Sequence, residues 1–327
     1  MQSRTHAVLR LALALTLMSA LGMGYAVAAV PTPARSLPGT NCPIFPADNY
    51  WHARVDSLPV NAASGQWLAN MGSDRTLHPD FGPSFGEQSV PYGIPITIVN
   101  GGERVPIRFE YADESDRVRY PLNSKTLIEG GSDAEGDRHA IVVDAESCTL
   151  FETWNTRLTA SGWTAGSGAV WSLRSNKLRP RSWTSADAAG LPILPGLLRW
   201  AEVRAGKVDH AIRFTTDVTQ RAFVWPARHH AGSTSDPSFP PMGARFRLKS
   251  GFSVSGFSAQ ARVVLQAMKR YGLVLADNGS PWYFQGDADE GWPEDLIGEL
   301  KKIPASAFEA VDASRLQVRP NSAAVRK

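Results

Sequence analysis

The 327-residue sequence has few of the features that announce nucleotide or metal chemistry. It contains no Gly-x-x-x-x-Gly-Lys-Ser/Thr loop, no Gly-x-Gly-x-x-Gly fingerprint after a strand, no His-Glu-x-x-His pair and no Asp-x-Asp-x-Asp-Gly calcium loop. We therefore expect no cofactor and no metal.

Charged residues make up only 20% of the chain and hydrophobic residues 43%, which is ordinary globular composition and excludes a wholly disordered protein.

Long hydrophobic runs are also lacking, apart from one at the beginning of the chain. Residues 1–10 carry two arginines and no acid, an apolar run follows over Leu11–Tyr25, and a small-x-small cleavage pattern ends at Ala28. This order predicts a secretory signal peptide over residues 1–28. The run is shorter than the roughly 20 residues that a membrane-spanning helix needs. We therefore expect a secreted protein, extracellular or periplasmic, with no membrane insertion.

An excess of charge of one sign is missing too. Removal of the signal peptide takes away two arginines and no acids, so the formal net charge falls from +3 to +1. This balance lacks the excess of positive charge with which proteins bind the phosphates of nucleic acid, so we expect no nucleic-acid partner. The densest basic cluster, residues 174–181, is interpreted as a solvated loop.

The two cysteines, Cys42 and Cys148, allow a single intramolecular pairing. Both lie in the exported part of the chain, where disulfides persist. We predict a Cys42–Cys148 disulfide that ties a Pro-rich segment to a strand in the middle of the chain, with Cα atoms about 4.4–6.8 Å apart. A closed loop of about 100 residues predicts a stabilisation of on the order of 4–5 kcal/mol.

Glycine and proline are frequent, with 28 and 23 residues, and this count disfavours a long helical bundle. Strand-like segments dominate instead. We expect hairpins that pair 91–100 with 104–111, 138–144 with 148–155, and 208–216 with 221–229, and a further strand over 244–249. These segments predict an all-β protein, a two-sheet sandwich of jelly-roll type with a few peripheral short helices.

Helical periodicity is confined to short segments. Ser258 caps a run with apolar residues at helical spacing, and Gly272 ends that run. Shorter helices are expected over 60–70 and 294–302, and a turn over 185–189.

The absence of internal repeats and long linkers favours one domain in the exported part. We divide that part into an extended leader over 29–41, one β-rich domain over 42–312 and a disordered tail over 313–327. A monomer is expected.

Five longer motifs are spread over the expected domain. They are Ile44-Phe-Pro-Ala-Asp-Asn49, Leu77-His-Pro-Asp-Phe-Gly82, Thr184-Ser-Ala-Asp-Ala-Ala-Gly-Leu-Pro-Ile193, His210-Ala-Ile-Arg-Phe214 and Leu275-Ala-Asp-Asn-Gly-Ser280. In these stretches, and over roughly residues 42–312, the sequence resembles a family of secreted bacterial single-domain proteins. The resemblance implies one secreted domain and assigns no catalytic role to any residue, since folds of this kind host many functions.

Two polar residues lie on otherwise apolar strand faces. Glu152 shares its face with Leu150 and Trp154, where burial would raise its pKa and suit it to general acid catalysis. The alternatives are a pairing with an arginine or an outward-facing strand. His210 also alternates with apolar residues, and the alternative to catalysis is a core histidine whose hydrogen bonds are satisfied. Arg213 faces the other way and is expected to pair with an acid.

Five further candidates come from strand ends and small-residue loops. His229 and Arg228 follow Trp225 near a strand end, where an aromatic beside a basic residue can hold a sugar ring and a carboxylate; the alternative is an exposed loop. Asp187 and Asp277 lie among small residues that allow close approach of a ligand, and the alternative for both is a turn stabilised by their side chains.

These features predict a secreted protein that acts on an extracellular polysaccharide, since ten tryptophans and a few polar groups suit a sugar cleft. A glycoside hydrolase would use two carboxylates, Glu152 and Asp187. A lyase would use His210 or His229 as base, with Arg228 to neutralise a uronate. The alternative is a non-catalytic module that binds glycan or a surface partner. A secreted peptidase is a weaker interpretation because no zinc signature is visible.

Overall fold

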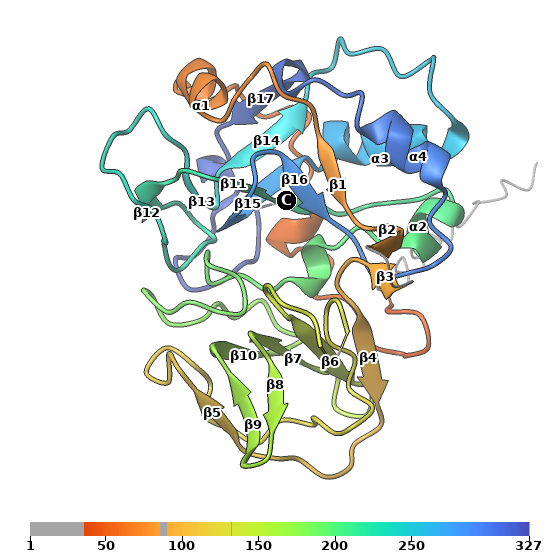
Figure 1. Cartoon of the computed structure of the whole chain (residues 1–327). Helices are drawn as coiled ribbons and strands as arrows, with labels where there is room; N and C mark the ends of the chain where they lie inside the picture. Colours follow the sequence, from red (N-terminus) through yellow and green to blue (C-terminus); the bar gives the residue numbers. More distant parts are fainter. Residues whose placement is uncertain (1–35, 86–89, 132, 327) are drawn as a thin grey trace, which may run out of the picture. The chain divides into compact units, whose positions relative to one another are not determined.

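Strands form most of the regular structure in the computed structural model, which describes residues 36–85, 90–131 and 133–326 (Figure 1). The expected signal peptide and residues 29–35 of the leader lie outside the described residues. The expected β-rich class is confirmed. The strands are β1 (His78–Asp80), β2 (Gly82–Phe85), β3 (Val90–Tyr92), β4 (Ile96–Val99), β5 (Ile107–Phe109), β6 (Ala140–Asp144), β7 (Thr149–Trp154), β8 (Arg157–Thr159), β9 (Gly162–Ala165), β10 (Ser167–Ser172), β11 (Ile212–Thr216), β12 (Gln220–Phe223), β13 (Pro241–Met242), β14 (Arg245–Leu248), β15 (Leu273–Asn278), β16 (Tyr283–Gln285) and β17 (Phe308–Val311).

The helices of the described residues are short, and the longest has 12 residues. The α-helices are α1 (Ser64–Asn70), α2 (Trp200–Arg204), α3 (Ala259–Arg270) and α4 (Glu294–Leu300), and the 3₁₀ turns are η1 (Tyr50–His52), η2 (Leu194–Gly196), η3 (Ala305–Ala307) and η4 (Ser314–Leu316). Helix α3 follows the expected pattern, because the Ser258 hydroxyl accepts from the amide of Ala261 and Gly272 follows the helix with a φ of +72°. Its buried face contacts strand β14.

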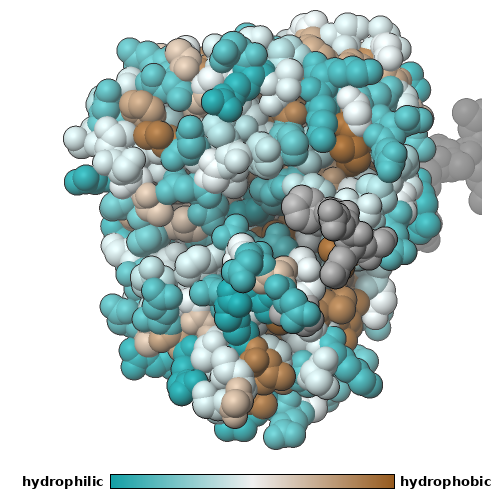
Figure 2. All heavy atoms as spheres, viewed as in Figure 1, coloured by the Kyte–Doolittle hydropathy of each residue, from teal (hydrophilic) through white to brown (hydrophobic). Residues whose placement is uncertain are grey.

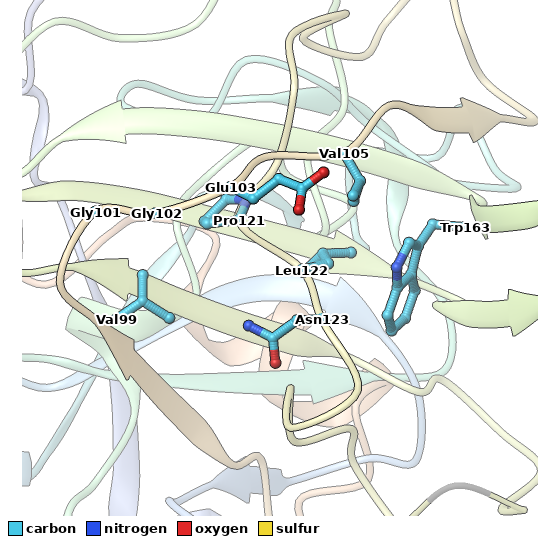
Figure 3. Close-up of a pocket in the computed structure, with 9 residues that line it drawn as sticks. All are labelled: Val99, Gly101, Gly102, Glu103, Val105, Pro121, Leu122, Asn123 and Trp163. Carbon is cyan, nitrogen blue, oxygen red and sulfur yellow. The ribbon is translucent and has the colours of Figure 1, made fainter.

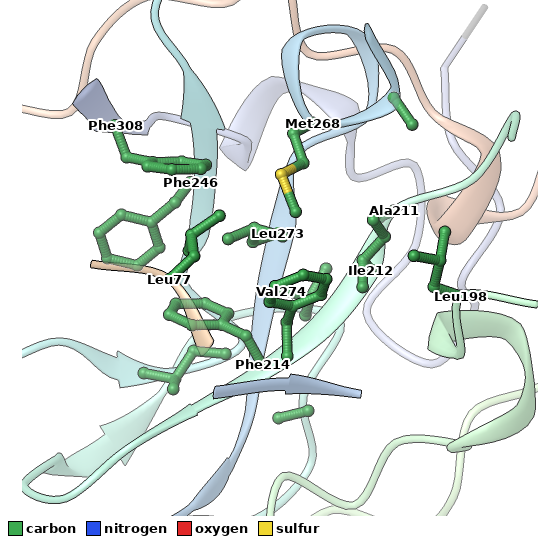
Figure 4. Close-up of a cluster of buried hydrophobic side chains, with 14 of the residues drawn as sticks. Leu77, Leu198, Ala211, Ile212, Phe214, Phe246, Met268, Leu273, Val274 and Phe308 are labelled. Carbon is green, nitrogen blue, oxygen red and sulfur yellow. The ribbon is translucent and has the colours of Figure 1, made fainter. Parts of the chain in front are cut away.

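A six-stranded mixed sheet forms the upper part of Figure 1, in the order β1-β16-β11-β15-β14-β17. Strands β11 and β15 run parallel, so the chain between them must cross over, and helix α3 lies in that connection. Figure 4 shows the core of this part, where Met268 of α3 lies near Leu273 and Val274 of β15. The rings of Phe214 and Phe246 pack edge to face, with centroids 5.4 Å apart.

A second sheet has the order β10-β7-β6-β4 and lies in the lower part of Figure 1. Strands β6 and β7 form the expected antiparallel hairpin, with Ile141 opposite Glu152. A three-stranded sheet, β5-β9-β8, lies beside it. Ile141 and Val143 of β6 and Leu150 of β7 are fully buried in the apolar cluster of this region.

Two of the expected hairpins are wrong. Strand β4 pairs with β6 and β5 pairs with β9, while β11 pairs with β15 and β16 and β12 pairs with β13. The local turn residues reverse the chain, but each strand finds its partner elsewhere in the sequence. Parallel pairs occur in both main sheets, so the jelly-roll connectivity, which uses antiparallel pairs, is not confirmed.

The C-terminal segment is ordered through residue 326, so the expected disordered tail is wrong for residues 313–326. Ala324 forms a β-bridge with Asn49, and the carbonyl of Ala323 accepts from the Tyr50 amide at 2.8 Å. Ala323 is also buried. The backbone groups of this segment are paired with the start of the described chain, which offsets the entropy lost on ordering it.

The expected Cys42–Cys148 disulfide is confirmed, with Cα atoms 5.3 Å apart. Both half-cystines are buried, beside Ile44 and Leu150 in the apolar cluster of the second sheet. The bond therefore fastens the segment around Cys42 to the turn that joins β6 and β7.

The surface of the described residues carries only scattered apolar side chains. Large exposed hydrophobic residues such as Leu127, Leu158 and Val318 come from different parts of the chain. The face shown in Figure 2 is largely hydrophilic, with small apolar patches. Among the described residues, no helix has both the length and the apolar character to cross a membrane.

Candidate active site

A cavity of about 420 Å³ brings together three of the titratable groups singled out in the sequence. Asp187, His229 and Asp277 line it, and so does Trp154 at the end of β7. The lining residues come from the second sheet, from the loop after β10 and from the end of β15. The cavity therefore collects polar side chains at strand ends and loops, where sites commonly form.

A second cavity, of about 380 Å³, lies between β4 and β9 (Figure 3). Its lining includes Glu103, Asn123 and Trp163, and Glu103 is the one titratable side chain among the lining residues. One carboxylate without a second acid or base nearby makes this cavity the weaker candidate for acid–base chemistry.

Asp187 is held by a bidentate ion pair. The Nε atom of Arg213 donates to Oδ2 of Asp187 at 3.0 Å, and Nη2 of Arg213 donates to Oδ1. The Asp187 side chain has no solvent exposure and that of Arg213 has 3%. The expectation that Arg213 pairs with an acid is therefore confirmed. Two such parallel bonds fix the geometry of the Asp187 carboxylate.

Asp277 lies next to this pair and reaches the cavity, with 25% of its side chain exposed. Its Oδ2 atom is 3.9 Å from Nη2 of Arg213 and accepts from the amide of Ala188 at 3.2 Å. Burial is the main cause that raises the pKa of Asp277 well above its ordinary value, and the neighbouring negative charge of Asp187 raises it further. Arg213 opposes this rise without cancelling it. This environment therefore favours the protonated form of Asp277.

The loop that carries Asp187 is fixed by a buried polar network. The Ser167 hydroxyl donates to the carbonyl of Ser185 at 2.6 Å, and the Ser185 hydroxyl accepts from the amide of Asp187 at 3.0 Å. His139 contacts the carbonyl of Ala186 through Nε2 at 3.1 Å. Ser185, Ala186 and Asp187 each take part in these hydrogen bonds. The loop therefore holds the Asp187 carboxylate in one position relative to the cavity.

His139 is itself held between two acceptors. Its Nδ1 atom lies 2.7 Å from Oε2 of Glu129, and its Nε2 atom faces the carbonyl of Ala186. Both ring nitrogens must donate, which requires the imidazolium form. Burial alone would lower the pKa of His139, but the Glu129 carboxylate overrides burial and raises that pKa to about 9.

This geometry predicts a loss of stability in mild alkali. A histidine with a raised pKa contributes its full stability below its ordinary pKa of about 6.5 and loses that stability as the pH rises through about 9. The free energy of unfolding, measured by urea titration at each pH, should therefore fall by about 3 kcal/mol between these values. In His139→Gln this fall should be absent, whereas the variant His78→Gln should retain it. An unchanged fall in His139→Gln would contradict the prediction.

His229 presents a defined tautomer at the wall of the cavity. Its Nδ1 atom lies 2.8 Å from the carbonyl of Ala188 and must donate to it. In the neutral ring, Nε2 is therefore the acceptor, and it lies 3.8 Å from Oε2 of Glu114. The Glu114 carboxylate also accepts from the amide of Thr184 at 2.9 Å. His229 and Glu114 thus lie side by side at the wall of the cavity.

Glu152 and His210 do not line the cavity. The Glu152 carboxylate is fully buried and accepts from the amides of Ile193 and Leu194 at 2.8–3.0 Å. Burial raises the pKa of Glu152 to about 7, although these two amide bonds oppose the rise. His210 is buried between Oε2 of Glu202, at 3.0 Å, and the carbonyl of Ala211. Both side chains hold local structure. This was the alternative interpretation of His210, whereas Glu152 binds backbone amides instead of the expected arginine or solvent.

Trp225 and Arg228 also lie outside the cavity. The indole of Trp225 donates to the carbonyl of Ser322 at 2.9 Å. Arg228 donates to the carbonyl of Pro320 and to Oδ1 of Asn321, both at 2.9 Å. Both residues therefore bind the C-terminal segment, which was expected to be disordered.

Sequence reasoning missed several residues of the cavity, above all Glu114, Asp137 and Tyr111. Glu114 and Tyr111 follow β5 in an irregular segment, and Asp137 lies in the loop before β6, so no periodic pattern marks them. Asp137 accepts from the indole of Trp154 at 3.1 Å, which orients that ring at the cavity. A cluster of acids and aromatics in loops is the only sequence signal that could have suggested them.

One further sequence pattern has no structural support. Gly82-Pro-Ser-Phe-Gly86 matches Gly-x-Ser-x-Gly, the pattern of a hydrolase nucleophile. Ser84 lies within strand β2 rather than on a strand-to-helix turn, so the required context is missing. Within the described ranges, no group of three or more His, Cys, Asp or Glu side chains is arranged to hold a metal ion.

Comparison with family models, curated proteins and solved structures finds no match to this chain. The resemblance to a family of secreted bacterial proteins therefore stays a prediction. The assignment of a function rests on the cavity itself.

The Asp187–Arg213 pair predicts a large cost for removal of the cation alone. Arg213→Met leaves the Asp187 carboxylate buried without a partner, which should lower the free energy of unfolding by about 3–5 kcal/mol. Urea titration measures this loss. The double variant Arg213→Met/Asp187→Asn should recover part of it, because the buried charge is gone. The exposed pair Arg54–Asp56 offers a control, since Arg54→Met should change the stability little. Equal losses in Arg213→Met and Arg54→Met would contradict the prediction.

Proposed function

We propose that the protein is a secreted glycoside hydrolase that cleaves an extracellular polysaccharide in the cavity lined by Asp187, His229 and Asp277. The observation that carries the proposal is Asp277, a partly exposed carboxyl group whose pKa is raised well above its ordinary value. A carboxylic acid with a raised pKa retains its proton more readily and can give that proton to the leaving oxygen of a glycosidic bond.

Asp187 acts as a positioning residue in this proposal, because it has no exposed surface. Its carboxyl group, fixed by Arg213, lies beside Asp277 and raises the pKa of Asp277. The second carboxylate that hydrolysis requires is Glu114, which lines the same cavity with 30% of its side chain exposed. Glu114 with Asp277 therefore replaces the pair of Glu152 and Asp187 expected from the sequence.

The aromatic side chains of Trp154 and Tyr111 support a sugar as substrate. Their ring centroids lie 6.3 Å apart, and both residues line the cavity. Flat apolar rings beside a few carboxylates suit the faces and hydroxyl groups of a sugar. The disulfide fits a protein that works outside the cytoplasm, where such bonds persist.

The lyase alternative has less support. It needs a histidine base and an arginine that neutralises a uronate carboxylate in one site. His229 lines the candidate cavity, but Arg228 binds Pro320 and Asn321 and lines a neighbouring cavity instead. His210 is enclosed by Glu202 and the backbone. The non-catalytic alternative needs the aromatics of the cavity but no raised pKa at Asp277.

Product analysis on a panel of polysaccharides tests the proposal. The purified protein is incubated with neutral and uronate-containing polysaccharides, and new reducing ends and unsaturated sugars are measured separately. Hydrolysis yields new reducing ends without unsaturated sugars, whereas a lyase yields both. Binding without any cleavage across the panel would favour the non-catalytic module and contradict the proposal.

A further inference from the structure

A large cavity next to the candidate site is lined by an unusual number of cations. It has a volume of about 620 Å³, and its cationic lining residues are Lys177, Arg179, Arg181 and Arg228. Asp116 is the single acid among the lining residues. Trp171 and Trp183 also line it. The cavity therefore combines positive charge with aromatic surface.

Most of this positive charge has no compensating acid. Asp116 already binds Arg179, whose Nη2 and Nε atoms also donate to backbone carbonyls. Lys177 and Arg181 are exposed, and neither forms an ion pair within the described residues. Three cations thus face the cavity with their charge uncompensated. Clustered cations that are not paired within the protein are a common basis for binding an anion.

Arg228 supplies an independent sign of a missing partner. Arg228 is 5% exposed, and its two terminal nitrogens donate to the carbonyl of Pro320 and to Oδ1 of Asn321. The Nε atom of Arg228 is buried and has no hydrogen-bond partner among the described residues. Burial lowers the pKa of Arg228, and the nearby positive charge of Arg181 lowers it further. Because Arg228 lines the cavity, an anion bound there would offset this repulsion.

The chain places this cavity directly beside the candidate active site. Trp183 and Arg228 line the cationic cavity, while the next residues along the chain, Thr184 and His229, line the site of Asp277. Neighbouring Cα atoms are about 3.8 Å apart. A polysaccharide long enough to span a few sugars can therefore occupy both cavities.

We propose that the cationic cavity binds an acidic sugar, one that carries a carboxylate or sulfate group, in the polysaccharide cleaved at Asp277. The inference rests on the proposed function, because it names the class of substrate for that site. Trp183 adds aromatic surface to the cavity, and the guanidinium carbon of Arg179 lies 5.4 Å from its ring centroid. The Phe223 ring holds Arg181 in place, with 4.6 Å between the guanidinium carbon and the ring centroid. The basic segment 174–181, expected to be a solvated loop, thus supplies three of the four cations.

Binding measurements on matched oligosaccharides test this inference. Isothermal titration calorimetry uses the full chain with Asp277→Asn, which prevents turnover, and three hexasaccharide probes: a galacturonate, a sulfated galactan and a neutral galactan. At least one acidic probe should bind more tightly than the neutral one, and added salt should reduce the difference. Comparison of the two acidic probes identifies carboxylate or sulfate as the preferred group.

The variant Arg181→Gln should weaken binding of the preferred acidic probe by about tenfold and leave binding of the neutral probe unchanged. Arg174→Gln is the matched control, since Arg174 is exposed in the same segment and does not line the cavity. Both positions are exposed, so neither change should prevent folding. Equal affinity for acidic and neutral probes, or equal effects of the two variants, would overturn the inference.

The two proposals can fail separately. Asp277-dependent cleavage of a neutral glycan, without any effect of Arg181→Gln on affinity, would retain the hydrolase and overturn the acidic subsite. Arg181-dependent binding of an acidic probe that the unmodified protein never cleaves would retain the subsite and contradict the hydrolase.

Discussion

Asp277→Asn is expected to lower the rate of glycosidic bond cleavage by about 10²–10⁴-fold, the usual contribution of a general acid. The amide has no acidic proton to give, but it preserves the size of the side chain and the oxygen that accepts from the amide of Asn278. The fold should therefore survive the change. The rate of reducing-end release, measured on the best substrate of the panel, checks the prediction.

Asp287→Asn provides the matched control for this variant. Desolvation raises the pKa of Asp287 to about 6, so Asp287 is also a partly exposed carboxyl group with a raised pKa. Its Oδ1 atom accepts from the amide of Trp200 at the beginning of α2, and it does not line the candidate cavity. Asp287→Asn should therefore retain activity. Full activity in Asp277→Asn, or an equal loss in both variants, would show that a raised pKa alone does not mark the catalytic acid.

Removal of the disulfide is expected to cause the largest loss of stability. The double variant Cys42→Ser/Cys148→Ser should lower the free energy of unfolding by about 4–5 kcal/mol, because the unfolded chain is no longer closed into a loop of about 100 residues. The double variant avoids a single unpaired thiol in the apolar cluster around Ile44 and Leu150. Urea titration of the oxidised protein and of the variant measures the difference.

The same experiment separates stability from function. Neither cysteine lines the candidate cavity, so the cleavage rate per folded molecule should be the same in Cys42→Ser/Cys148→Ser as in the unmodified protein. Reduction of the unmodified protein should reproduce the stability of the variant. A stability loss below about 1 kcal/mol would mean that the bond adds little to a segment already held by packing.

Local features of the fold were predictable from the sequence, and long-range pairing was not. Helix α3 follows from the Ser258 cap and its apolar spacing, and the β6–β7 hairpin follows from two alternating segments joined by a short turn. The parallel partners β4–β6 and β11–β15 lie far apart in the chain. Alternation indicates which face of a strand is buried, but it does not identify the neighbouring strand.

The candidate site was predictable in part for a related reason. Asp187, His229 and Asp277 were singled out from small-residue loops and strand ends, and these three lie in one cavity. Glu152 and His210 were singled out from apolar strand faces, and both are enclosed by bonds to backbone and side chains. A polar residue on an apolar face is usually buried, and a buried polar group needs partners before it can serve a substrate.

The pairing of the two ends of the described chain has a consequence for the order in which the protein can be completed during synthesis. Val311 bridges to Val60, and strand β17 covers the edge of β14 near the end of the chain. A nascent chain that has not yet reached β17 therefore leaves the hydrogen-bonding edge of β14 open, and such edges invite aggregation. Completion of the large sheet therefore requires the chain through Val311.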